Sequence, residues 1–153
     1  KYIGYKITRK LKINFIDVDQ EIEKKIGMKI HMIFRKEGEK YFRKIEEDLT
    51  LKTLKKNNTV ISLGGGAFLN PKIKKQILEN HISFWLNWEI TTLVDRIEKN
   101  QKRPIAFNST RNELIELIKK RSIVYSKAMY KIECENLTKD QIAKNILKIY
   151  EAH

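Results

Sequence analysis

Three consecutive glycines, Gly64 to Gly66, directly follow the short apolar run Val60-Ile61-Ser62-Leu63. Such a run ending in glycines is typical of a buried strand that enters a tight loop. Because glycine has no side chain, a ligand can lie directly against the N–H groups of the loop. In open α/β sheets, ligands bind beyond the carboxyl ends of the strands. Half of the six glycines stand here, so we expect this loop to belong to a binding site.

Strand-like and helix-like segments alternate along the chain. This alternation predicts an α/β fold, a parallel sheet covered by helices on both sides in three α/β/α layers. Neither repeats nor linkers break the pattern, so we expect a single domain over residues 1–153. The expected helices span residues 1–11, 20–26, 30–36, 39–56, 71–80, 91–100, 111–129 and 138–150, and the expected strands span residues 13–17, 60–63, 82–88 and 131–134.

The composition limits the classes of function. A chain of 153 residues with 41% hydrophobic residues can bury a core. It contains no apolar run of about 18 residues, so we expect no membrane span. Cys134 is the single cysteine, and we expect it to be buried and structural. The net charge of +13 suits anionic partners, but the lysines are spread over every helix, which favours a solvated basic surface over nucleic-acid binding.

Two carboxylates close the first expected strand. Asp17 ends that strand and Asp19 follows two residues later, at the sheet edge where the triple glycine is also expected. A carboxylate there can bind a hydroxyl, hold Mg²⁺ through water or accept a proton. The alternatives are structural, since Asp17 suits a strand-end turn and Asp19 suits the cap of a helix that begins at Gln20.

Three arginines are candidates for binding anions. Arg43 lies on an expected helix that could face the same edge, and a guanidinium can bind a carboxylate through two parallel hydrogen bonds. Arg103 lies in the polar stretch before residue 111, and Arg121 lies on the helix that follows. Arginines near a closing segment can neutralise charge during phosphoryl transfer. Each of the three, taken alone, is also an ordinary surface residue.

The order and spacing of these pieces are more specific than any one of them. Together they resemble the shikimate kinase family, from about Gly4 to the end of the chain. The matching pieces are Phe15-Ile16-Asp17-x-Asp19, Gly27-Met28, Ile33-Phe34, Gly38-Glu39-x-x-Phe42-Arg43-x-x-Glu46, Ser62-Leu63-Gly64-Gly65-Gly66-Ala67, Arg103-Pro104 and Arg121-x-x-x-Tyr125.

The resemblance implies a fold and an activity. Shikimate kinases are P-loop enzymes, similar to nucleoside-monophosphate kinases, with a lid segment. They transfer the γ-phosphate of ATP to the 3-hydroxyl of shikimate, using Mg²⁺, on the route to chorismate and aromatic amino acids. We accordingly expect ATP and shikimate as substrates, and a cytoplasmic monomer that binds neither nucleic acid nor membranes.

The resemblance also implies roles for single residues in the acceptor pocket. Asp19 would bind the shikimate hydroxyls and act as the catalytic base, or near it, while Arg43 and Arg121 would hold the carboxylate. The implied shikimate-binding set is Asp19, Phe34, Phe42, Arg43, Gly64, Gly65, Gly66 and Arg121, in which the glycines supply N–H groups and the phenylalanines an apolar wall.

Further residues are implied on the nucleotide side. Asp17 resembles the acidic residue that holds Mg²⁺ through water. Arg103 resembles the lid arginine that reaches over the phosphates, within a lid at residues 101–111. The turn around Glu135 and Asn136 resembles the segment that packs on adenine.

One part of the family pattern is absent. The family begins with a strand and a Gly-x-x-Gly-x-Gly-Lys-Ser/Thr phosphate loop, and no such loop stands in this sequence. Counting back from Gly4 places Lys1 at the Ser/Thr position of the loop, or at its lysine if the match slips by one residue. We expect a kinase whose strand and loop precede Lys1. The alternatives are an inactive relative that keeps the pocket as a binding module, and a related kinase for another hydroxy acid such as gluconate.

Overall fold

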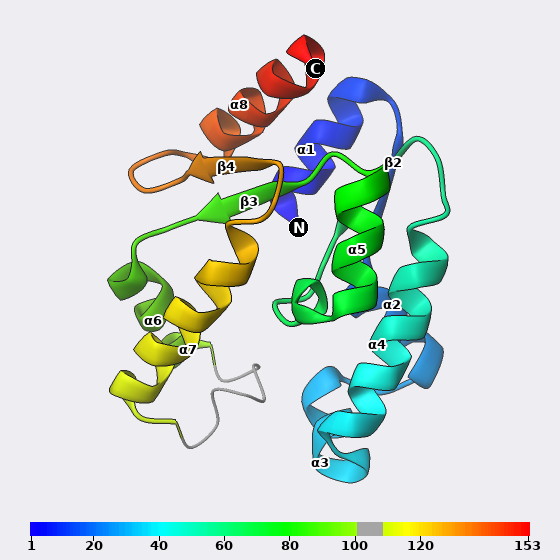
Figure 1. Cartoon of the computed structure of the whole chain (residues 1–153), viewed down its shortest axis with the longest axis vertical. Coiled ribbons are helices and arrows are strands. Elements are labelled where there is room, and N and C mark those ends of the chain that lie inside the picture. The colour runs from blue at the N-terminus through cyan, green and yellow to red at the C-terminus, as the bar shows by residue number, and fades with distance from the viewer. Residues whose placement is uncertain (101–108) are drawn as a thin grey trace.

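The computed structural model describes residues 1–100 and 109–153. Helices and strands alternate along these residues as the sequence predicts (Figure 1). In chain order the elements are α1 (Tyr2–Leu11), β1 (Asn14–Asp17), α2 (Val18–Ile26), α3 (Ile30–Glu37), α4 (Glu39–Thr53), β2 (Thr59–Ser62), the 3₁₀ helix η1 (Ala67–Leu69), α5 (Pro71–Asn80), β3 (Phe84–Asn87), α6 (Ile90–Lys99), α7 (Arg111–Tyr125), β4 (Tyr130–Glu133) and α8 (Lys139–Ala152).

The described strands form two parallel pairs instead of one continuous sheet. β1 pairs with β2, with Asp17 opposite Ser62, and β3 pairs with β4, with Asn87 opposite Glu133. Every residue of β2 and β3 is only half-buried. The inner strands of a parallel sheet are normally buried on both faces, whereas β2 and β3 each pair with one strand among the described residues.

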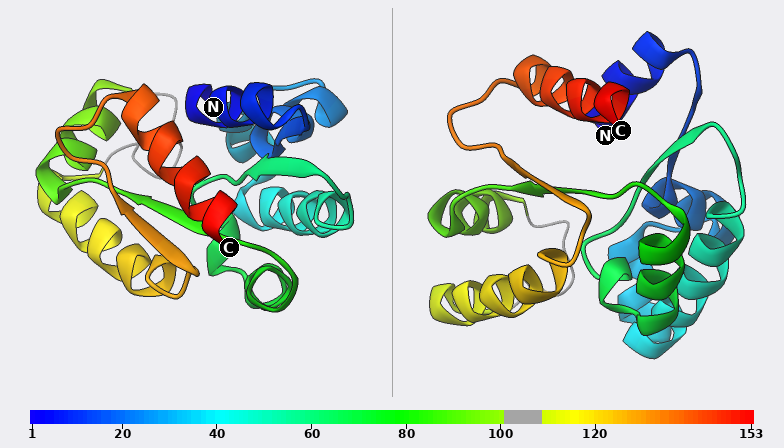
Figure 2. Two further views of the ribbon diagram at one scale, coloured as in Figure 1. Left: turned by 90° about the horizontal axis from the view of Figure 1, so that it is seen from above. Right: turned by 45° about the horizontal axis from the view of Figure 1, so that its top comes forward.

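Helices α1 and α8 pack together on one side of both strand pairs, as the right-hand view of Figure 2 shows. Their shared core takes Ile7 from α1 and Ile146 from α8, together with Val60 of β2 and Phe84 of β3. Because one cluster contains residues of both pairs, the two pairs lie in one layer. Cys134 is buried in this core as expected, and burial raises the pKa of its thiol to about 11.

The other helices cover the opposite side of the strands. Ile61 of β2 points away from the α1–α8 layer, into a core shared with α2, α3 and α4, as the alternation of side chains along a strand requires. A second cluster joins η1 and α5 to α4 and α7, and a third lies between α6 and α7. Helices α4 and α7 therefore flank the triple glycine, and both pack against η1 and α5.

Most helix and strand boundaries lie within a few residues of the prediction, and the notable differences concern the start of α2 and the end of α7. Asp17, and not Asp19, caps α2: its Oδ1 accepts a hydrogen bond from the Gln20 N–H at 3.2 Å. The helix therefore begins at Val18, directly after the strand, and Asp19 lies in its first turn. Helix α7 begins at Arg111 as predicted, where the expected lid ends, but it ends at Tyr125 instead of residue 129.

No helix in the described part of the chain has the length and apolar character needed to cross a membrane.

Candidate acceptor site

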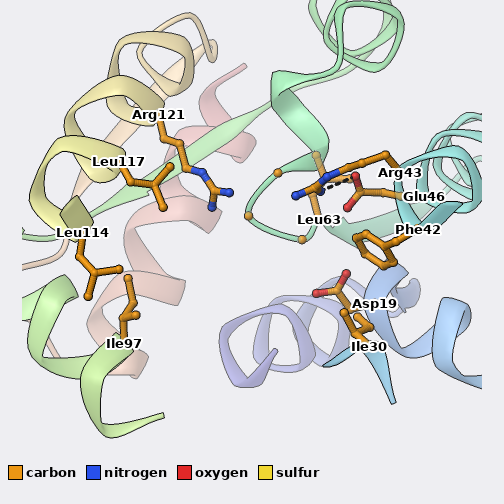
Figure 3. Close-up of a pocket in the computed structure, with 13 residues that line it drawn as sticks. Asp19, Ile30, Phe42, Arg43, Glu46, Leu63, Ile97, Leu114, Leu117 and Arg121 are labelled. Carbon is orange, nitrogen blue, oxygen red and sulfur yellow. Dashed lines mark hydrogen bonds and ion pairs between the residues drawn. The ribbon is translucent and has the colours of Figure 1, made fainter. Parts of the chain in front are cut away.

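A cavity of about 230 Å³ lies beside the triple glycine (Figure 3). Its wall combines two arginines, two carboxylates, the glycine loop and a set of apolar side chains. Because these residues come from α2, α3, α4, α6, α7 and the loop after β2, the cavity depends on the packing of five helices around that loop. The lining residues are Asp19, Ile30, Phe42, Arg43, Glu46, Leu63, Gly64, Gly65, Gly66, Ile97, Leu114, Leu117 and Arg121.

Asp19 enters the cavity from the first turn of α2. Its carboxylate lies directly against Gly64, where a β-carbon would stand 2.5 Å from Oδ1. The N-terminal end of a helix favours negative charge because its unpaired N–H groups point outward. This environment suits an ionised carboxylate that accepts hydrogen bonds from hydroxyl groups.

Arg43 projects into the cavity from α4 and is held on several sides. Its Nη1 donates to Glu46 Oε1 at 2.8 Å, and its Nε lies 3.5 Å from Glu39 Oε1. The guanidinium also lies over the rings of Phe42 and Phe34, at 5.3 and 5.9 Å from their centroids. Glu46 is only 3% exposed, and a buried carboxylate of this kind is retained at low cost only when it is paired. The Glu46 pair therefore fixes the guanidinium at the cavity wall.

Arg121 approaches from α7 on the opposite side of the cavity (Figure 3). Its Nε is buried and has no hydrogen-bond partner among the described residues. None of the ion pairs between described residues involves Arg121 either. A buried donor without a partner costs free energy that a bound anion can recover. Arg121 and Arg43 together make this cavity attractive to a carboxylate or a phosphate.

Each glycine of the loop lies against one polar side chain of the site. Gly64 lies against Asp19, Gly65 against Arg121 and Gly66 against Arg43. The three have ordinary backbone angles, since the glycines with positive φ are Gly27 and Gly38. The loop thus needs glycine for space: a β-carbon at any of the three positions would occupy the volume that a polar side chain uses.

The remaining predicted residues lie around this centre. Phe34 does not line the cavity but packs behind Phe42, at 4.7 Å between ring centroids. Asp17 stands at the carboxyl end of β1 as the α2 cap. Arg103 lies outside the described residues. Glu135 accepts hydrogen bonds from the Glu89 N–H at 3.1 Å and the Thr92 hydroxyl at 2.8 Å, so it caps α6.

The neighbouring Asn136 adopts a left-handed conformation with φ 64°.

No described group of three or more His, Cys, Asp and Glu side chains has the arrangement of a metal site. Asp17 can nevertheless act through water, because Gln20 binds its Oδ1 and leaves Oδ2 for a second contact. A single carboxylate at the sheet edge fits Mg²⁺, which keeps most of its waters and is often bound through one or two carboxylates and the substrate phosphates.

The sequence alone indicated no separate role for Glu46 or for the apolar wall of the cavity. Glu46 appeared only as part of a motif, although an acid three residues after an arginine on one helix face signals a pair. The apolar wall formed by Ile97, Leu114 and Leu117 brings α6 and α7 to the cavity. No local signal marks this wall, because the three side chains continue the ordinary apolar stripes of their helices.

The chain is similar to known proteins along nearly its whole length. The family model described as shikimate kinase matches residues 2–151. A shikimate kinase of Persephonella marina is 36% identical over 145 residues, which cover 95% of this chain and 88% of the relative. The shikimate kinase of Bacillus subtilis is 35% identical over 152 residues, covering 95% of this chain and 80% of the relative.

The chain belongs to the shikimate kinase family. Solved structures agree with this assignment. The crystal structure of the Aquifex aeolicus shikimate kinase superposes with a TM-score of 0.87 at 31% identity, covering 98% of this chain and 88% of that one. The Acinetobacter baumannii shikimate kinase in complex with shikimate superposes with a TM-score of 0.91 at 27% identity, covering 99% of this chain and 86% of that one.

Family membership confirms the predicted fold class and the predicted reaction. The fold is the α/β fold of the P-loop shikimate kinases, with helices on both sides of parallel strands. The chain is a phosphotransferase of the shikimate kinase family, for which ATP is the phosphoryl donor. The relatives named above are themselves shikimate kinases.

Proposed function

We propose that this cavity binds shikimate and presents its 3-hydroxyl to the γ-phosphate of ATP. The observation that carries the proposal is the convergence of Asp19, Arg43 and Arg121 on three glycines. Two cations and one carboxylate complement a molecule that carries one carboxylate and several hydroxyls. The apolar wall complements the carbon ring. ATP-dependent transfer to this acceptor would place the protein on the route to aromatic amino acids.

The two arginines would bind the shikimate carboxylate. Arg43 is immobilised by Glu46 before any ligand arrives, so its guanidinium loses little conformational freedom on binding. The buried Nε of Arg121 gains the partner that it lacks among the described residues. Because the two approach from α4 and α7, a bound carboxylate would also link these two helices across the cavity.

Asp19 would orient the 3-hydroxyl and take its proton. In the transfer step, the hydroxyl oxygen forms a bond to the γ-phosphorus, and the bond from that phosphorus to the β–γ bridging oxygen breaks. The electron pair leaves on ADP, while the hydroxyl proton passes to the Asp19 carboxylate. Asp17 would hold Mg²⁺ through water, and that ion would neutralise charge on the phosphates. We assign Arg103, Glu135 and Asn136 to the nucleotide side, with the lid at residues 101–111.

An acceptor assay tests the proposed function. We expect a protein expressed from the full gene to release ADP from ATP and Mg²⁺ when shikimate is added, and not when gluconate is added. Methyl shikimate lacks the free carboxylate. Its KM should be about 10- to 100-fold higher than that of shikimate, the loss expected for charge-assisted hydrogen bonds. Binding of shikimate without ADP release would instead support an inactive binding module.

A further strand would complete the sheet between β2 and β3. Two features support this proposal: the half-exposure of both strands and the core that they share beneath α1 and α8. In the family pattern, the phosphate loop follows that strand, so we place both before Lys1.

We further propose that the protein is a cytoplasmic monomer that does not bind nucleic acid.

Nucleotide affinity tests this placement of the phosphate loop. The 153-residue chain should bind ATP and Mg²⁺ at least about 100-fold more weakly than the protein from the full gene, because several charge-assisted hydrogen bonds to phosphate are lost. Calorimetric titration of both proteins with a non-hydrolysable ATP analogue measures the difference. Tight, Mg²⁺-dependent binding by the 153-residue chain would contradict the proposal.

A further inference from the structure

The glycine loop is also held from outside by a tyrosine of α7. The Tyr125 hydroxyl donates a hydrogen bond to the carbonyl oxygen of Gly65. The two flanking carbonyls are used within the turn: Gly64 accepts from the Ala67 N–H at 3.2 Å, and Gly66 accepts from the Leu69 N–H at 3.1 Å. The middle carbonyl of the loop is therefore fixed by a residue 60 positions away in the sequence.

This bond fixes a donor as well as an acceptor. The Gly65 carbonyl and the Gly66 N–H belong to one planar trans peptide, so they point in opposite directions. Glycine peptides rotate easily, because no β-carbon restricts their backbone angles. A donor that holds the carbonyl toward α7 consequently holds the Gly66 N–H on the other side of the peptide plane.

The same turn of α7 carries a group of the acceptor site. Arg121 stands four residues before Tyr125, so both side chains lie on one face of the helix. The Arg121 Nη1 would stand 3.0 Å from a β-carbon on Gly65, and the Tyr125 hydroxyl 3.7 Å from it. One short stretch of helix thus places an arginine in the cavity and holds the loop that separates it from Arg43.

Tyr125 is itself held in place by packing. Its ring lies 6.1 Å from the Trp85 ring of β3, centroid to centroid, and it packs against the core that includes Phe68 of η1 and Ile73 of α5. A side chain fixed by a strand and two helices can transmit their positions to the loop. A tyrosine that served only as core packing would not need its hydroxyl on the loop.

We propose that Tyr125 is a positioning residue for the acceptor pocket. Its hydroxyl sets the orientation of the Gly65–Gly66 peptide and the distance of that peptide from Arg121, so that the Gly66 N–H is presented in the orientation that binds substrate. Tyr125 acts through the loop and does not touch the acceptor. This inference rests on the proposed function, because it deepens the account of the same pocket.

The test compares two variants that each lose one phenolic hydroxyl. Tyr125→Phe keeps the ring and its contact with Trp85. Tyr130→Phe is the matched control, since its hydroxyl bonds His153 Nδ1 at 2.9 Å in the C-terminal region, and Tyr130 is absent from the cavity lining. Both proteins are expressed from the full gene. Selective ¹⁵N-glycine labelling follows every glycine amide, including the six of this chain.

We expect Tyr125→Phe to shift the Gly66 amide resonance in the absence of ligand, and to leave those of Gly4, Gly27 and Gly38 unchanged. KM for shikimate should rise about 3- to 10-fold, the range for one net hydrogen bond, while KM for ATP stays within about twofold. Tyr130→Phe should change neither the loop resonances nor either KM. Thermal unfolding of both variants shows whether a difference in stability could explain the result.

Two outcomes overturn the proposal: an unchanged Gly66 resonance in Tyr125→Phe, or the same rise in KM for shikimate in the Tyr130→Phe control. The ligand-free spectrum also separates this inference from the proposed function. If shikimate moves no loop resonance of the unsubstituted protein, the proposed function fails. The ligand-free shift of the Gly66 resonance alone then decides the positioning role: a shift supports it, and an unchanged resonance contradicts it.

Discussion

Replacing Asp19 with asparagine is expected to lower kcat for shikimate phosphorylation by about 10²–10⁴-fold, the usual contribution of a positioned general base. The amide keeps the size of the carboxylate and still accepts a hydrogen bond from the acceptor hydroxyl. It cannot take the proton of that hydroxyl. KM for shikimate should therefore change much less than kcat. Steady-state release of ADP, with shikimate varied at saturating ATP, measures both quantities.

The control for this substitution is Asp48→Asn on α4. Asp48 is 58% exposed and pairs with Lys44 at 3.2 Å, away from the cavity lining. It undergoes the same chemical change, so its kcat should stay within about twofold, as for a surface pair worth little free energy. If Asp19→Asn also keeps kcat within about threefold, then Asp19 only binds the hydroxyls and another group accepts the proton.

The fold could be predicted largely because its signals are local. The pair Asn70-Pro71 predicted the start of α5. In the structure, the Asn70 side chain accepts hydrogen bonds from the N–H groups of Lys72 and Ile73. Phe84 and Leu86 alternate with Trp85, and the two sets face opposite layers, Phe84 and Leu86 toward α8 and Trp85 toward α7. The spacing of apolar residues along the sequence reveals such patterns, and burial of the side chains follows this spacing.

Other features depend on pairing between distant residues and could not be predicted. Whether the strands form one sheet or two pairs depends on which neighbouring strands are present. The sequence of each strand looks the same in both cases. The choice between Asp17 and Asp19 as the cap depended on whether a residue separates β1 from α2, and none does. Either aspartate has the chemistry of a cap.

The site was predicted from a pattern of motifs, but its physical logic appears only in three dimensions. From the sequence, the triple glycine indicated exposed N–H groups next to a ligand. The structure adds that each glycine leaves room for a different polar side chain. Space of this kind is a tertiary property, because Arg43 and Arg121 lie 23 and 55 positions from Gly66 in the sequence.

Replacing Gly66 with alanine is expected to raise KM for shikimate about 10- to 100-fold, the loss expected for a charge-assisted hydrogen bond. The new β-carbon would stand 2.7 Å from the Arg43 Cζ, so the guanidinium must move. Gly66 has a φ of −100°, which alanine adopts without strain. The fold should therefore survive, and a melting temperature close to that of the unsubstituted protein would confirm that the loss is local.

A double-mutant cycle with Arg43→Ala separates this clash from a general disturbance of the loop. If Gly66→Ala acts by displacing Arg43, it should have almost no further effect on KM once the guanidinium is gone, and the two effects will not add. Gly65→Ala provides a graded comparison, because its β-carbon would meet Arg121 Nη1 at the less severe distance of 3.0 Å. Full additivity of Gly66→Ala and Arg43→Ala would mean that the glycine serves the loop backbone instead of making room for the arginine.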